Sequence, residues 1–118
     1  MDLVKRLLKH KEKTLSETVN TKTLGKVQLL PLYMSHRSEF HKKDLVEGER
    51  NFLLLMIALS AAEDGQRLVD SLSIDEVISM FDVLGQSKDG LEDLYTLYKA
   101  ANNLSKVTVD DVEEAKKN

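Results

Sequence analysis

The sequence predicts an α+β fold that is mainly α, with an N-terminal β-hairpin followed by a bundle of about four helices. β-branched residues gather in residues 13–30, and apolar residues recur at helical spacing in several later segments. The length of 118 residues and the 42% share of hydrophobic residues suffice for one modest core. We therefore expect a single domain over residues 13–105, an amphipathic helix or arm over residues 1–12, and a charged helix or tail over residues 106–118.

The first twelve residues place leucine and valine at helical spacing between basic residues. We expect this arm to dock on the domain, and a membrane-surface role is the alternative. No apolar run of signal-peptide quality follows it, so a secretory leader is not expected. The longest apolar run, residues 52–62, is far shorter than the roughly 20 residues that cross a bilayer. Cysteine is absent, which excludes disulfides and thiolate chemistry and fits a reducing cytoplasm.

Charge is divided unevenly along the chain. Residues 1–43 hold ten Lys and Arg against four Asp and Glu, a net charge of +6, whereas residues 44–118 hold seven against sixteen, a net charge of -9. Complementary patches of this kind can steer a partner or favour head-to-tail self-association. Ordinary solvated surface charge is the simpler alternative.

The hairpin is predicted to turn near Asn20, and its second strand ends at Pro31 because proline has no amide donor for the ladder. Ser35 is expected to cap the next helix, which contains Glu39. A polar connection then ends near Gly48.

Three further helices are predicted. Residues 49–62 are apolar nearly all round, which is typical of a central helix or of one partly at an interface. A turn at residues 63–65 separates this helix from a helix over residues 74–84, which begins with the capping-box pair Ser73 and Glu76. That helix is expected to bury Val77, Ile78, Phe81 and Leu84.

Gly85 and Gly90 flank the next predicted break. A last amphipathic helix follows over residues 91–103, with apolar residues at Leu91, Leu94, Leu97, Tyr98 and Ala101. In the tail, Thr108 is a candidate cap with Asp110 and Asp111 in the first turn.

No catalytic, cofactor-binding or metal-binding residue is predicted. His36 and His41 are five residues apart and do not share a helix face as metal ligands four apart would. Ser60 has no glycine elbow around it, and no glycine-rich loop precedes a helix. The adjacent acid pairs Glu63–Asp64, Asp75–Glu76, Glu92–Asp93 and Asp110–Asp111 are interpreted as helix caps and dipole partners. We therefore expect no enzyme and no cofactor.

Nucleic-acid binding is an open alternative that the sequence does not favour. The basic first third could contact phosphates, and a helical domain could hold a helix-turn-helix. However, the helices from residues 74 and 91 begin with acidic pairs, which would repel phosphate where base-reading side chains normally enter.

The order of elements resembles the tail assembly chaperones of tailed bacteriophages or prophages with siphovirus-type tails. The resemblance spans residues 24–105 and lies in patterns of residue class. It rests on the segments Leu24-Gly25-Lys26-Val27, Leu29-Leu30-Pro31-Leu32, Ser38-Glu39, residues 55–60, residues 63–68, the Ser73-capped helix with Asp75-Glu76-Val77, and Asn102-Asn103-Leu104-Ser105.

The resemblance implies a non-enzymatic helper that binds the tape measure protein, a long helical chain, and keeps it soluble until tail tube subunits polymerise around it. The tail tube protein and a second copy of the chain are further candidate partners, whereas a membrane is not expected. No functional residue carries over from the family. The alternative function is a small helical phage regulator that binds nucleic acid or a host protein.

The resemblance also implies a longer product made by slippage back one nucleotide near the end of the frame. Residues 116–118 are Lys-Lys-Asn, and Lys-Asn can be encoded AAA-AAC, which after an A forms a slippery heptamer. We hypothesise that 118 residues is the short, unshifted product.

Overall fold

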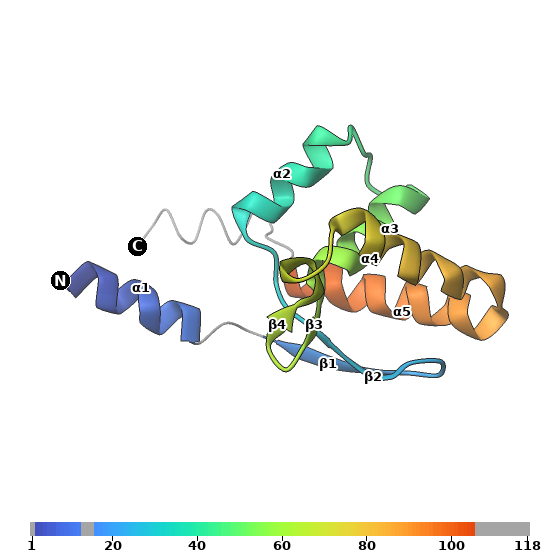
Figure 1. Cartoon of the computed structure of the whole chain (residues 1–118), viewed down its shortest axis with the longest axis horizontal. Coiled ribbons are helices and arrows are strands. Elements are labelled where there is room, and N and C mark those ends of the chain that lie inside the picture. Colours follow the sequence, from blue (N-terminus) through green and yellow to red (C-terminus); the bar gives the residue numbers. More distant parts are fainter. Residues whose placement is uncertain (1, 13–15, 106–118) are drawn as a thin grey trace.

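The computed structural model describes residues 2–12 and 16–105 (Figure 1). The fold is α+β and mainly α, as predicted, and the predicted tail with Thr108 lies outside the described residues. Along the chain the elements are α1 (Asp2–Glu12), β1 (Glu17–Thr21), β2 (Gly25–Leu29), α2 (Met34–Lys42), α3 (Arg50–Ser60), β3 (Ala61–Glu63), β4 (Gln66–Arg67), the 3-10 helix η1 (Leu68–Asp70), α4 (Ile74–Asp82), the 3-10 helix η2 (Val83–Gln86) and α5 (Lys88–Ser105).

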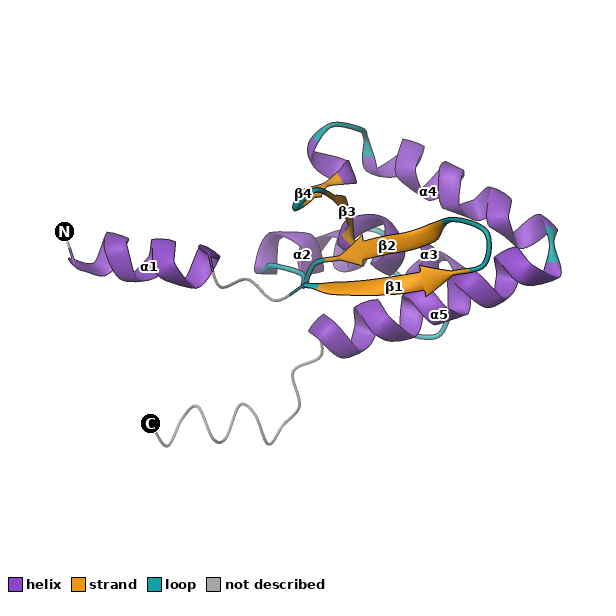
Figure 2. Cartoon of the chain, turned by 90° about the horizontal axis from the view of Figure 1, so that it is seen from below, coloured by secondary structure: helices purple, strands orange, loops and turns teal. Residues whose placement is uncertain are grey.

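The described residues hold five α-helices and a four-stranded antiparallel sheet in the order β1-β2-β3-β4 (Figure 1). The predicted arrangement of a hairpin followed by about four helices is therefore matched only in part, because β3 and β4 extend the hairpin into a larger sheet. In Figure 2, α3 and α5 lie over one face of the sheet.

The first hairpin turns at residues 22–24, so the predicted turn near Asn20 is wrong. Asn20 pairs with Lys26 inside the ladder. The turn forms later because the Thr21 hydroxyl accepts a hydrogen bond from the Leu24 amide (3.0 Å) and donates one to the Gly25 carbonyl (2.8 Å). Gly25 has a φ of 73°, a left-handed conformation that glycine adopts without steric cost.

The apolar helix ends at Ser60, two residues before the predicted boundary. Ala61 and Ala62 instead form β3 and pair with Leu29 and Gln28 of β2. The turn predicted at residues 63–65 is confirmed. It joins β3 to β4 through Asp64 and Gly65, whose φ values of 53° and 80° are those of a tight hairpin turn.

Tyr33 occupies the N-cap position of α2 in place of the predicted Ser35, which lies in the first turn. The Tyr33 amide donates to Nδ1 of His36 (3.0 Å), and the two rings stack with centroids 5.3 Å apart. Nδ1 must be unprotonated to accept this bond. Consistently, burial first and the positive charge of Arg67 second hold the pKa of His36 below its usual value.

The predicted N-cap of α4 is confirmed, because Ser73 Oγ accepts a hydrogen bond from the Glu76 amide at 3.1 Å. Val77 and Phe81 are buried as predicted, and Ile78 and Leu84 pack partly buried against the core. The chain then tightens into η2.

Helix α5 begins at Lys88, three residues before the predicted start. Gly90 is buried inside its first turn and is not part of a break. A Cβ on Gly90 would lie 2.0 Å from the carbonyl oxygen of Leu84, so glycine permits the backbones of α5 and η2 to touch. The side chain of Ser87 supports this start by accepting a hydrogen bond from the Gly90 amide (3.0 Å).

The core forms around α3, the helix that the sequence predicts to be central. Residues 54–60 of α3 are all buried, against the sheet on one side and against α4 and α5 on the others. The largest apolar side chains that are fully buried are Leu29, Leu55, Ile57, Leu59, Val77 and Leu97.

Helix α1 does not dock on the domain, contrary to the prediction. Its residues 2–9 are all exposed, including the apolar side chains of Leu3, Val4, Leu7 and Leu8. Among the helices described, none combines the length and the apolar character needed to cross a bilayer.

Candidate functional site

A groove lies where the first half of α3, the end of α4 with η2, and the first half of α5 meet. It encloses about 540 Å³. We call it the α3–α5 groove. Its lining residues are Gly48, Arg50, Leu53, Leu54, Asp82, Val83, Gly85, Gln86, Leu91, Leu94 and Tyr95.

The groove has an apolar floor and an exposed apolar rim. Leu54 and Leu94 are buried at its base. Val83, Leu91 and Tyr95 remain 57%, 46% and 53% exposed although each lines the groove. Large apolar side chains that gather on one surface in this way mark candidate interaction sites.

The close contact between Gly90 and Leu84 creates this geometry. It brings the start of α5 directly against η2, so that Val83 of η2 and Leu91 of α5 line the same groove. Leu91 and Tyr95 are four residues apart and share one helix face. The buried residues Leu94 and Leu97 anchor another face of α5 in the core.

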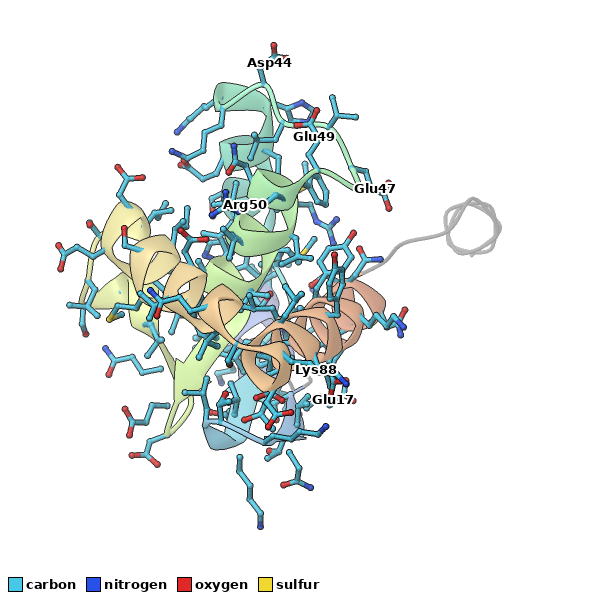
Figure 3. The ribbon with its side chains drawn as sticks, turned by 90° about the vertical axis from the view of Figure 1, so that its right-hand side faces the viewer. Glu17, Asp44, Glu47, Glu49, Arg50 and Lys88 are labelled. Atoms are coloured by element: carbon cyan, nitrogen blue, oxygen red, sulfur yellow. The ribbon has the colours of Figure 1, made fainter. Side chains whose placement is uncertain are left out.

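Acidic residues flank the groove. Figure 3 shows Glu47 and Glu49 beside the start of α3, at Arg50. Burial first and the negative charge of Glu47 second raise the pKa of Tyr98, which indicates that Glu47 also lies close to α5. Within the groove the charges of Arg50 and Asp82 form an ion pair between α3 and α4. The groove is therefore acidic on the side of Glu47 and Glu49, while Lys88 adds a positive charge at the start of α5 and the groove's own two charged groups neutralise each other.

A second hollow lies between the tip of the first hairpin and α4, and it encloses only about 170 Å³. Leu24, Leu68, Met80, Phe81 and Leu84 line it. It is too small for more than one or two side chains, and we take the larger groove as the candidate site.

Arg67 is buried but serves the fold. Its guanidinium donates to the carbonyl oxygens of Leu59 (2.9 Å) and Pro31, and it lies over the Tyr33 ring, 4.9 Å from the centroid. These carbonyls belong to the end of α3 and to the segment after β2. Arg67 thus satisfies two backbone acceptors where three segments meet.

The acid pairs discussed above do not converge. Glu63 and Asp64 lie in the second hairpin, and Asp75 and Glu76 lie in the first turn of α4, while Asp110 and Asp111 are outside the described residues. Among the side chains of residues 2–9 and 16–105, no three from His, Cys, Asp or Glu come together as metal ligands. Ser60 is fully buried, and its hydroxyl has no hydrogen-bond partner among the residues that the structure describes.

Asp93 is the exception to the interpretation of the acid pairs as helix caps. Its carboxylate, only 3% exposed, accepts hydrogen bonds from the amides of Lys22 (2.9 Å) and Thr23 (2.8 Å) and from the Thr23 hydroxyl (2.6 Å). It therefore holds the turn of the first hairpin against α5. Its neighbour Glu92 pairs at the surface with Lys22 (2.6 Å).

The sequence patterns place the apolar residues of the groove in predicted helices, and they place Gly48 and Gly85 in predicted connections between helices. Leu91 belongs to the apolar residues predicted for the last helix, whereas Val83 and Tyr95 are not singled out. The available signal was the pair Leu91 and Tyr95, which the helical period places off the stripe formed by Leu94, Leu97 and Ala101. An apolar pair off the buried stripe indicates an exposed apolar face.

In comparisons with known proteins, the chain matches no family model, no curated protein and no solved structure.

Proposed function

We propose that this protein is a non-enzymatic tail assembly chaperone that acts in the host cytoplasm and holds helical segments of the tape measure protein in the α3–α5 groove. The observation that carries the proposal is the apolar groove with its exposed rim at Val83, Leu91 and Tyr95. An amphipathic helix that lays its apolar face into such a groove is a common mode of recognition.

The chemistry of the groove favours a polypeptide over a small polar substrate. The charged groups in its lining, Arg50 and Asp82, are paired with each other and are not directed at a shared point as catalytic groups would be. The acidic residues Glu47 and Glu49 at its edge suit an amphipathic helix that carries basic residues beside its apolar stripe. We propose the tape measure protein as the bound helical polypeptide, the client, because the family resemblance implies it.

Acidic residues also weigh against the alternative of a regulator that binds nucleic acid. Asp75 and Glu76 lie in the first turn of α4, and Asp89 lies in that of α5. These charges would repel phosphate at the helix ends that usually approach DNA. The neighbouring genes offer an independent check, because the proposal expects a major tail protein gene upstream and a very long tape measure gene downstream.

We predict that Tyr95→Glu will weaken binding of a tape measure fragment from the same phage or prophage about tenfold or more, a loss of at least ~1.4 kcal/mol. The introduced carboxylate would have to be desolvated against the client and would add to the acidic surroundings. Tyr95 is exposed, so the variant should fold. The measurement is co-purification of the full chain with the co-expressed fragment, followed by titration calorimetry.

Met80→Glu is the matched control, because Met80 is a comparably exposed apolar residue (51%) outside the groove, at the second hollow. It should bind like the wild type. If the wild type fails to bind the fragment although both proteins are soluble alone, the proposed client is wrong. If both variants bind equally well, the groove is not the site.

A further inference from the structure

Helix α1 carries an apolar stripe that no described residue covers. Leu3, Val4, Leu7 and Leu8 form it at three- and four-residue spacing, and Leu3 and Leu7 are 62% and 60% exposed. An isolated helix of this length, eleven residues, is marginal in water. Most of its stability must therefore come from packing of this stripe against another surface.

The charges of α1 are opposite to those around the α3–α5 groove. Lys5, Arg6 and Lys9 outweigh Asp2, which gives residues 2–9 a net charge of +2. At the groove, Arg50 and Asp82 cancel. The flanking residues 47–49 contribute two glutamates, a charge of -2. Attraction between the two surfaces would orient a helix that enters the groove.

Both surfaces also present apolar side chains in the rows by which helices pack. The stripe of α1 presents Leu3 and Leu7 four residues apart, and the rim of the groove presents Leu91 and Tyr95 at the same spacing. Rows of side chains at this spacing interdigitate when two helices pack. Both surfaces are apolar, and both are exposed in the single chain.

Helix α1 of the same chain is poorly placed to fill the groove. Strand β1 begins at Glu17, which pairs with Leu29, and the nearby Leu32 amide donates to Ser105 Oγ (3.0 Å) at the far end of α5. Ser105 is about 21 Å along the helix from Leu91. The five peptide steps from Glu12, the last residue of α1, to Glu17 span at most about 18 Å. In Figures 1 and 2, α1 projects from the end of the sheet opposite the start of α5.

We propose that α1 of one copy docks in the α3–α5 groove of a second copy. Because the arm and the groove are different surfaces, this contact is heterologous, and repetition joins copies head to tail into short chains or a ring. One short helix buries less than the roughly 1,000 Å² of a stable interface, so the assembly is weak and depends on concentration. The inference depends on α1 and the groove, and it does not depend on whether the groove also binds the tape measure protein.

The test compares the sedimentation of the wild type with that of three full-length variants, from micromolar to millimolar concentration. Leu7→Glu disables the arm and leaves the groove intact, while Tyr95→Glu disables the groove and leaves the arm intact. The wild type should assemble with rising concentration, less so at high salt. Each of these variants alone should remain monomeric, and Met80→Glu should assemble like the wild type.

Mixing the two defective variants provides the decisive result. Leu7→Glu keeps an intact groove, and Tyr95→Glu keeps an intact arm. The two variants together should therefore form a discrete 1:1 dimer and nothing larger. A wild type that stays monomeric throughout, or a Leu7→Glu variant that assembles normally, would overturn the inference. It also falls if α1 binds vesicles that contain anionic lipid but does not bind a second copy.

The outcome is separable from that of the proposed function. If the chain binds its client through Tyr95 but never self-associates, the inference fails and the function stands. If the mixed variants dimerise but the tape measure fragment does not bind, the inference stands and the proposed function fails. If both are correct, adding the tape measure fragment will dissolve the head-to-tail assemblies, because α1 and the client compete for one groove.

Discussion

Gly90→Ala will destabilise the protein by about 2–3 kcal/mol. An alanine Cβ at this position would lie 2.0 Å from the carbonyl oxygen of Leu84 and 2.9 Å from Ser87 Oγ. The nearest atom is backbone, so α5 or η2 must shift to relieve the overlap. The usual gain of about 1 kcal/mol from replacing glycine in a helix is outweighed. Urea denaturation monitored by circular dichroism measures the change.

Gly85→Ala is the matched control for this variant. Gly85 lies in the adjacent η2, and a Cβ there would meet nothing within 4 Å. We expect stability to be unchanged or raised by up to about 1 kcal/mol, because alanine restricts the unfolded chain. If Gly90→Ala proves as stable as the wild type, the backbone contact that shapes the α3–α5 groove is not as close as described.

Asp93→Ala will cost about 2–3 kcal/mol, because hydrogen bonds to a charged group are among the stronger ones and their donors are left without a partner. The amides of Lys22 and Thr23 and the Thr23 hydroxyl all donate to this carboxylate. The loss should appear first in the hairpin, as faster amide exchange in β1 and β2. Glu92→Ala removes only an exposed ion pair and should cost less than about 1 kcal/mol.

The cost of Asp93→Ala will depend on pH. Burial by itself raises the pKa of Asp93, but the hydrogen bonds from the Thr23 hydroxyl and from the Lys22 and Thr23 amides outweigh burial and lower it. The carboxylate therefore contributes stability above the unfolded pKa of about 3.9, and the contribution is lost as pH falls through the lower folded value. Denaturation curves of both proteins should converge in acid. A constant difference between pH 6 and strong acid would contradict this account.

Local patterns predicted much of the helical part of the fold. The helix after Ser73 begins at the next residue, as expected when Ser73 is its N-cap. The turn at Asp64 and Gly65 was predictable because glycine tolerates a left-handed backbone conformation. The central position of the apolar helix follows from its composition alone. In each case the decisive residues are close neighbours in the sequence.

The errors arose where contacts between distant segments decide the structure. Ala61 and Ala62 extend a helical pattern, but pairing with Leu29 and Gln28 converts them to a strand. Asp93 resembles any acid near a helix start, and its role depends on the hairpin turn 70 residues earlier in the chain. Glycine at position 90 marks a break by composition, but close packing against Leu84 keeps it inside α5.

The helical period marks Leu91 and Tyr95 as an apolar pair off the buried stripe, but it does not show that they line a groove. The lining of the groove comes from segments distant in the sequence, and which of their side chains meet depends on how α5 crosses η2. The excess of basic residues before residue 44 and of acidic residues after it was visible from the sequence. Only the structure relates these charges to an exposed basic helix and to a groove with two glutamates at its edge.

The central claim is that the α3–α5 groove holds a helical segment of another polypeptide. Amide hydrogen exchange of the full chain, with and without the tape measure fragment, tests it most directly. We expect slower exchange in residues 82–95 and at the start of α3, with little change in β3 and β4. Slower exchange confined to the sheet or to α2, with the groove unchanged, would contradict it.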